Sequence, residues 1–204
     1  MHHPVTALGP GRRVGLWVQG CALGCHGCMA RDTWDPAAGS ALPVAELLRR
    51  LDSTFGADST LTGLTISGGE PLEQPEAVRS ILAWLRERRP EVDSLLYTGW
   101  SQGRVGRDEL WVMQAADALV PEPFVAGRAP GGRWRGSANQ PLLLLSDLAR
   151  ERHSTAEGGS PALQISVTGG QLSLIGIPRP GDLDRMVDLA RARGLSVRDL
   201  SWSD

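Results

Sequence analysis

The segment RVGLWVQGCALGCHGC, residues 13–28, runs from an alternating apolar stretch directly into a group of cysteines. The alternation predicts a β-strand whose apolar face is formed by Val14, Leu16 and Val18. The chain holds three cysteines, all in this segment and spaced C-x3-C-x2-C: Cys21, Cys25 and Cys28. Three thiolates on one loop can hold three irons of a cubane iron–sulfur cluster, which leaves the fourth iron open to a substrate or cofactor.

Other interpretations explain the cysteines less well. Three cysteines cannot all pair within one chain, and such close spacing is not typical of unrelated core residues. A structural zinc site usually has four ligands, often as two separated C-x2-C pairs, and only one such pair is present. His26 could be a fourth ligand, but its place between two cysteines favours a loop residue beside the cluster. His2 and His3 are interpreted as a mobile terminus, and His153 falls in an expected connector.

Composition limits the classes of function. The 204 residues suffice for one domain with a buried core, and 41% hydrophobic with 22% charged residues is ordinary for a globular protein. A formal net charge of −2 predicts no nucleic-acid partner. Because no apolar run has the length of a membrane span or a signal core, we expect a cytoplasmic protein without a membrane partner. All 21 basic residues are arginine, which excludes a Schiff-base or P-loop lysine.

The middle of the chain alternates between strand and helix patterns. Apolar residues at helical spacing predict helices in residues 43–51, 75–89 and 107–116. Short apolar runs predict strands in residues 13–20, 63–71, 93–99 and 117–120. This order of elements is typical of an α/β fold with a parallel sheet and helical crossovers.

Two segments interrupt the alternation. Residues 121–141 are rich in Gly, Pro and Arg, and a long loop of this kind is often functional. Residues 151–161 are predicted to be a flexible connector between a core of residues 1–150 and a C-terminal extension of residues 162–204, packed on that core. Within the extension we expect a hairpin around Gly169–Gly170, then a helix over 181–194 and a last strand over 195–200.

The cysteine spacing directly after the first strand resembles the signature of the radical S-adenosylmethionine superfamily. The segment SGGEP, residues 67–71, ends the next strand and resembles the GGEP motif of that superfamily. The resemblance implies an incomplete (β/α) barrel, here with a small C-terminal hairpin-plus-helix extension, and one [4Fe-4S] cluster on the three cysteines. It also implies that the open iron binds S-adenosylmethionine, which one electron cleaves to methionine and a 5′-deoxyadenosyl radical that abstracts a hydrogen atom.

The same resemblance assigns residues to S-adenosylmethionine. Glycines let the backbone approach a ligand, and carbonyl and carboxylate oxygens can accept hydrogen bonds from its amino group. The segment YTGW, residues 97–100, closes the third strand, where ligands of α/β proteins usually lie. The predicted cofactor-binding residues are Ser67, Gly68, Gly69, Glu70, Thr98, Gly99 and His26.

The segments LWVQGCALGCHGCMARDTWDP, GLTISGGEPL, LLYTGW, DALVPEPF and WRGSANQ resemble the activating proteins of anaerobic ribonucleoside-triphosphate reductases in order and spacing. This resemblance implies an oxidoreductase that installs a glycyl radical on a large partner enzyme, the protein substrate. It implies a reductant such as flavodoxin or ferredoxin. The loop RWRGSANQ is then the expected substrate or partner loop, with planar donors for a backbone or carboxylate. Its residues are Arg133, Trp134, Arg135, Gly136, Ser137, Asn139 and Gln140.

The chain departs from that pattern at Ala30, Arg31, Pro121 and Pro141, where the family usually has Asn-Pro, an acidic residue and Arg. These departures leave the radical chemistry intact and keep the substrate open. One alternative is a radical enzyme that modifies a peptide or a small metabolite. A non-catalytic iron–sulfur or zinc-binding module is another, but it leaves SGGEP unexplained.

Overall fold

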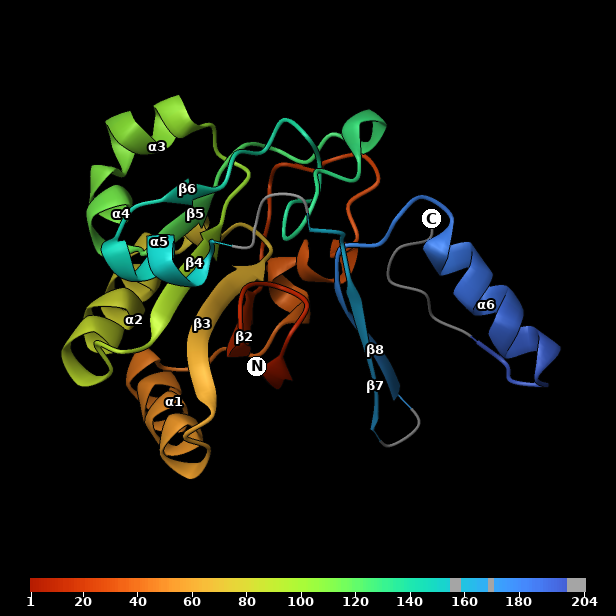
Figure 1. The fold of residues 1–204 in the computed structure, drawn as a ribbon, viewed down its shortest axis with the longest axis horizontal. Helices are drawn as coiled ribbons and strands as arrows, with labels where there is room; N and C mark the ends of the chain where they lie inside the picture. The colour runs from red at the N-terminus through yellow and green to blue at the C-terminus, as the bar shows by residue number, and fades with distance from the viewer. Residues whose placement is uncertain (155–158, 169–170, 198–204) are drawn as a thin grey trace.

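The computed structural model describes residues 1–154, 159–168 and 171–197, and its centre is a sheet of six strands in the order β1-β2-β3-β4-β5-β6 (Figure 1). The strands are β1 (His2–Val5), β2 (Arg12–Val18), β3 (Leu61–Gly68), β4 (Asp93–Tyr97), β5 (Ala118–Val120) and β6 (Leu143–Leu144). Strands β2 to β5 pair in parallel, whereas β1 and β6 pair antiparallel at the two edges. The described chain is therefore mixed α/β with a mostly parallel sheet.

The parallel register brings three connecting segments together at the carboxyl-terminal end of the parallel strands. Val18, the last residue of β2, pairs with Gly68, the last residue of β3. On the other side of β3, Ile66 pairs with Leu96 near the end of β4. The cysteine loop, the SGGEP segment and the TGW segment therefore all start at this carboxyl-terminal end, which is the usual place for a ligand site in an α/β sheet.

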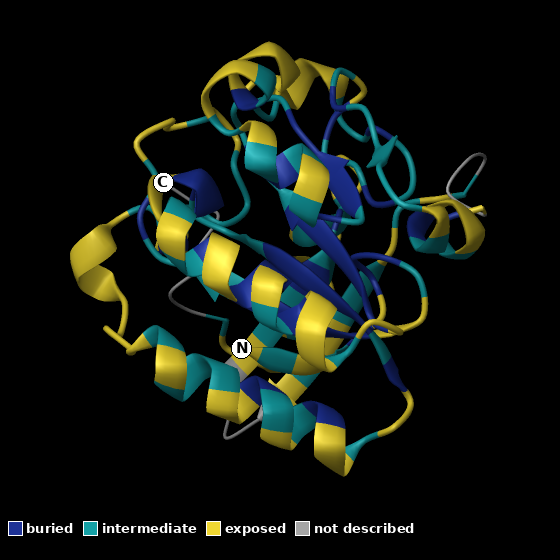
Figure 2. Cartoon of the chain, turned by 90° about the vertical axis from the view of Figure 1, so that its left-hand side faces the viewer, coloured by how far each residue is buried: buried dark blue, intermediate teal, exposed yellow. Residues whose placement is uncertain are grey.

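Helices cover one face of the sheet, where the largest apolar core lies. They are α1 (Val44–Ala57), α2 (Pro75–Arg88), α3 (Gln102–Asp108) and α4 (Leu110–Ala115). Figure 2 shows their exposed residues facing outward and the buried strands behind them. The buried helix residues in this core are Leu51, Phe55, Val78, Ile81, Leu82, Leu85, Val105 and Val112. They pack on strand residues such as Leu64, Ile66 and Leu96 and so remove a continuous apolar surface from water.

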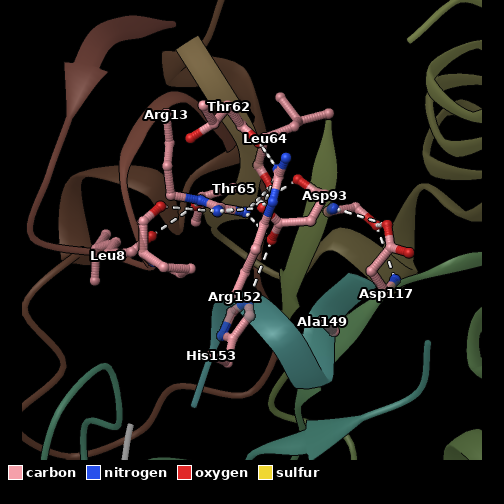
Figure 3. A network of polar contacts seen from close by, with 12 residues as sticks. Leu8, Arg13, Thr62, Leu64, Thr65, Asp93, Asp117, Ala149, Arg152 and His153 are labelled. Atoms are coloured by element: carbon pink, nitrogen blue, oxygen red, sulfur yellow. Dashed lines mark hydrogen bonds and ion pairs between the residues drawn. The ribbon is translucent and has the colours of Figure 1, made fainter. Parts of the chain in front are cut away.

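The opposite face carries a buried network of charges at the amino ends of the strands (Figure 3). Asp93 accepts hydrogen bonds from Arg13 Nη1 at 3.0 Å and from Arg152 Nη1 at 3.1 Å. Its other oxygen lies 3.1 Å from His153 Nε2. Arg13, Asp93 and His153 are each at most 1% exposed. The network joins the starts of β2 and β4 to the end of helix α5 (Asp147–Arg152).

The hairpin of the C-terminal extension lies beside the N-terminal segment, with α6 (Asp182–Ala192) on its far side from the sheet (Figure 1). The hairpin consists of β7 (Leu163–Thr168) and β8 (Gln171–Gly176). Ile175 and Ile177 form a small buried cluster with Val5 and Leu8. The Gln164 side chain accepts the Thr6 N–H at 2.8 Å and donates to the Pro4 carbonyl at 2.7 Å. The two strands of the predicted hairpin are confirmed, while residues 169–170 lie outside the described residues.

The N-terminal prediction was wrong. His2 and His3 belong to strand β1, in which His2 pairs with Gly15 of β2. The prediction failed because a strand of four residues at a sheet edge has too few positions to show an alternating pattern.

Three further predictions need correction or limits. Residues 151 and 152 end helix α5 and His153 is buried at its end, so these residues do not belong to a flexible connector. The helix predicted over 107–116 is two short helices, α3 and α4, separated at Glu109. In the predicted last strand, residues 195–197 are not in a strand and 198–200 lie outside the described residues. Among the described residues, no helix combines the length and apolarity that a membrane crossing requires.

Candidate functional site

The three cysteines lie on the loop that leaves the carboxyl end of β2. All three are partly buried and carry free thiols. The start of this loop is held by backbone bonds, from Gly20 N–H to Thr33 O at 2.8 Å and from Cys21 N–H to Trp34 O at 3.0 Å. The Cys28 N–H donates to Cys25 O at 3.1 Å, which turns the chain between the second and third cysteines.

The donor set fits an iron–sulfur cluster better than a single metal ion. Within the part of the chain that the structure describes, no three His, Cys, Asp or Glu side chains converge as a site for one ion. A cubane cluster does not need such convergence, because each thiolate binds a different iron. Three free thiols on one short loop, close to a sheet edge, match that requirement in number and type.

The SGGEP segment packs directly on the cysteine loop. Gly69 N–H donates to Val18 O, and Glu70 N–H donates to Gly20 O, both at 2.8 Å. A Cβ atom at Gly68 would lie 2.5 Å from the Val18 nitrogen, and one at Gly69 would lie 2.1 Å from the Gly20 oxygen. Gly68 also has a φ of +106°, which favours glycine. The two glycines therefore let the two loops approach to backbone contact.

Glu70 links the ends of β3 and β4. It is 1% exposed, and its carboxylate accepts hydrogen bonds from Leu72 N–H at 2.9 Å, Thr98 Oγ1 at 2.6 Å and Gly99 N–H at 2.7 Å. Burial raises the pKa of Glu70, although these three hydrogen bonds oppose the rise. Both carboxylate oxygens thus have partners within the protein, and Thr98 and Gly99 are held by them.

The other predicted cofactor residues lie around this contact. Ser67 pairs with Trp17 in the last part of β3. Gly99 lies under the cysteine loop, since a Cβ there would approach Leu23 Cδ1 to 2.3 Å. His26 is exposed on the outer part of the loop. The structure therefore brings the cysteine loop, SGGEP and TGW together, with His26 at the periphery.

Sequence reasoning missed three residues that hold the cysteine loop. Glu73 Oε1 accepts the Ala22 N–H at 2.9 Å, and Gln74 Nε2 donates to Gln19 O at 2.8 Å. Gln19 Nε2 donates in turn to the carbonyls of residues 32 and 35, at 2.9 and 2.7 Å. These contacts flank Gly20 and Cys21 on both sides. The only signal in the sequence is that Glu73 and Gln74 lie close behind SGGEP, separated from it by Leu72.

The cysteines lie in an environment that disfavours free thiolates. Burial raises the pKa of Cys21 and of Cys25, and the negative charge of Glu70 adds to the rise for both thiols. A backbone hydrogen bond from Leu23 partly offsets the rise at Cys21, and one from Phe124 does so at Cys25. A bound metal centre would supply the positive charge that stabilises the thiolates.

Much of the RWRGSANQ loop is buried. Trp134 is 3% exposed and packs edge-on against His153 with ring centroids 5.3 Å apart, so it does not form an open surface. Tyr97 donates its hydroxyl to the Trp134 carbonyl at 2.7 Å. The Arg133 guanidinium lies over the Trp134 ring, and Arg135 Nη1 donates to Gln140 O at 3.3 Å. Gly136 is half-buried beside Phe124, where a Cβ would come within 3.1 Å of the ring.

A three-cysteine loop and a glycine-rich loop meet at the carboxyl-terminal end of the sheet. This combination defines an iron–sulfur class of protein. Residues 7–143 match the family model of the 4Fe-4S single cluster domain, and the chain belongs to this family. Residues after 143, including the hairpin and α6, lie beyond this match.

Individual relatives make the similarity more specific. The chain is 32% identical to the anaerobic ribonucleoside-triphosphate reductase-activating protein of Enterobacteria phage T4, over 68% of this chain and 88% of the relative. It is 30% identical to the protein of the same name from Vibrio cholerae, over 68% of this chain and 92% of that protein. The protein of that name from Escherichia coli K12 is 31% identical, over 68% of this chain and 93% of that protein.

Proposed function

We propose that this chain is a radical S-adenosylmethionine enzyme that installs a glycyl radical on an anaerobic ribonucleoside-triphosphate reductase. Cys21, Cys25 and Cys28 would hold one [4Fe-4S] cluster. The observation that carries the proposal is the direct backbone contact between the cysteine loop and SGGEP, through Gly69 N–H to Val18 O and Glu70 N–H to Gly20 O. The relatives named as activating proteins support the choice of partner.

The cluster and S-adenosylmethionine, when bound, supply electron transfer and hydrogen-atom abstraction. The protein holds the segments that would bind the cluster and the cofactor in fixed positions. Gly68 and Gly69 let SGGEP lie in backbone contact with the cysteine loop, and Thr98 and Gly99 are fixed beside them by Glu70. An ammonium group next to Glu70 would favour its ionised form and so oppose the rise in its pKa that burial causes.

Three further parts of the proposal concern fold, electron supply and location. We take the mostly parallel sheet with its helical face as the incomplete (β/α) barrel of the radical S-adenosylmethionine type. The electron would come from a small reductant such as flavodoxin or ferredoxin. The three free thiols suit a reducing compartment, which supports the cytoplasm as the location.

The test uses the full chain, reconstituted anaerobically with iron and sulfide, together with a purified anaerobic ribonucleoside-triphosphate reductase. After addition of S-adenosylmethionine and a reductant, electron paramagnetic resonance should detect a glycyl radical on the partner. Cys25→Ala should abolish it, because one iron ligand is lost. Formation of 5′-deoxyadenosine without a radical on the partner would instead favour a peptide or a small metabolite as the substrate.

A further inference from the structure

The segment of residues 137–140, here called the SANQ segment, has two side-chain amides that donate hydrogen bonds to backbone carbonyls of the protein. Asn139 Nδ2 donates to Pro123 O at 2.9 Å. Gln140 Nε2 donates to Glu122 O, also at 2.9 Å, and Gln140 is 8% exposed. Two neighbouring amide side chains therefore bind two neighbouring carbonyls of one segment, and each amide nitrogen donates one hydrogen bond within the fold.

Ser137 binds the other end of the same segment. Its hydroxyl oxygen accepts the Val125 N–H at 3.1 Å, and Ser137 is fully buried. Its own N–H donates to Gln140 Oε1 at 3.0 Å, which fixes the orientation of the Gln140 amide. The SANQ segment thus holds residues 122, 123 and 125 through side-chain contacts.

Phe124, at the centre of the segment so held, faces the cysteine loop. Its ring lies beside Gly27, where a Cβ would come within 3.7 Å of the ring and within 3.2 Å of Ala126 Cβ. The stretch between the second and third cysteines therefore packs on residues 124–126.

We propose that the SANQ segment positions the part of the cysteine loop between Cys25 and Cys28, by holding residues 122–125 so that Phe124 and Ala126 pack against Gly27. The inference rests on the proposed cluster. Hydrogen bonds to the sulfurs are among the factors that set the reduction potential of such clusters. Moving this part of the loop changes the solvent exposure and the hydrogen bonding of the sulfurs that would bind the cluster, and with them the reduction potential. Part of the expected substrate loop thereby acquires a role in tuning the cluster.

The experiment compares Asn139→Asp and Gln140→Glu with the unaltered protein. Both changes keep the size of the side chain and remove the amide donor to a carbonyl. Arg128→Ala is the matched control, because Arg128 is exposed on the same loop. Each reconstituted protein is titrated with a reductant, without S-adenosylmethionine or partner, and the reduced cluster is followed by electron paramagnetic resonance. We expect a shifted reduction potential and an altered spectrum in the two variants, and no change in the control.

Ser137→Ala provides an independent variant, since it removes the acceptor of the Val125 N–H without adding charge. Circular dichroism and iron content identify any variant that does not fold. Variants that fold, keep the cluster and match the unaltered protein in potential and spectrum would overturn the inference. If radical transfer to the partner alone then falls, the segment is a partner-binding element. Failure of the unaltered protein to take up about four irons per chain would instead overturn the proposed function.

Discussion

Glu70 shows how a single buried residue can hold a site together. Its carboxylate accepts three hydrogen bonds, from Leu72, Thr98 and Gly99, and so joins the segments that follow β3 and β4. Sequence resemblance assigned it to the amino group of the cofactor. The contacts show that it also builds the loop on which such a cofactor would rest.

Glu70→Gln should lower the free energy of unfolding by about 1–3 kcal/mol, because an amide NH2 group faces at least one donor that is left unpaired. Denaturant unfolding, monitored by circular dichroism, measures this loss. Glu76→Gln is the control, since Glu76 is exposed on α2. Equal stability of the two variants would show that the three contacts of Glu70 do not hold the loop.

Glu73 is a second single residue that holds the cysteine loop, and it is exposed on the surface. Its carboxylate accepts the Ala22 N–H next to Cys21. Glu73→Ala releases this N–H, so we expect the reconstituted cluster to lose iron to a chelator faster than in the unaltered protein. Glu76→Ala is the matched control on the following helix. Iron loss at the same rate in both variants would contradict a role for Glu73 in holding the loop.

At the scale of elements, the contact between the ends of β2 and β3 depends on Gly69. Gly69→Ala would place a Cβ 2.1 Å from the Gly20 oxygen and 2.9 Å from the Thr33 oxygen. We expect a loss of about 1–3 kcal/mol in stability from overpacking, and a lower iron content because the cysteine loop is displaced. Gly103→Ala is the control, since no atom lies within 4 Å of its Cβ position and it is in helix α3. Unchanged iron content in Gly69→Ala would refute the close approach.

The central strands and the long helices were predictable because their residues are numerous enough to show a period. Helix α2 places Val78, Ile81, Leu82 and Leu85 on one buried stripe. The edge strands β1 and β6 have four and two residues, too few for any pattern. Helix α5, with sequence DLARER, is largely polar and is followed by His153, whose partner Asp93 lies 60 positions away. A contact across that separation leaves no local signal.

In the candidate site too, some residues could be proposed from the sequence and others only from the structure. Cys21 and SGGEP could be proposed as site residues from the sequence, because residue type and spacing are visible there, and the structure brings the two segments into contact. The roles of Glu73 and of the SANQ segment could not be proposed in this way, because they depend on which backbone groups each side chain reaches. Asn139 and Gln140 illustrate this difference. Their donors suggested an external ligand, and the structure shows them bound to carbonyls of Pro123 and Glu122.

At the scale of the whole molecule, the network around Asp93 joins the sheet to helix α5. Burial acts to raise the pKa of Asp93, but the hydrogen bond with His153 and the charge of Arg13 outweigh burial and hold the pKa far below its ordinary value of 3.8. Asp93→Asn would leave the Arg13 guanidinium buried without its counter-charge. We expect a loss of about 3–5 kcal/mol in the free energy of unfolding, measured by denaturant titration.

The pH dependence of stability tests the same network. Because the pKa of Asp93 is depressed in the folded state, its contribution is fully present above pH 3.8 and is lost as the pH falls further toward the folded-state pKa. The difference in stability between the unaltered protein and Asp93→Asn should therefore shrink below pH 3.8. A difference that does not shrink as the pH falls below 3.8 would show that Asp93 is not held ionised by its neighbours.

The most direct test of the central claim is the production of 5′-deoxyadenosine by the anaerobically reconstituted and reduced protein after addition of S-adenosylmethionine. The account predicts that the unaltered chain forms this product, and that the signal of its reduced cluster changes when S-adenosylmethionine binds. Cys25→Ala should form none. Cleavage that persists in Cys25→Ala, or a complete cluster whose signal does not respond to S-adenosylmethionine, would contradict the account.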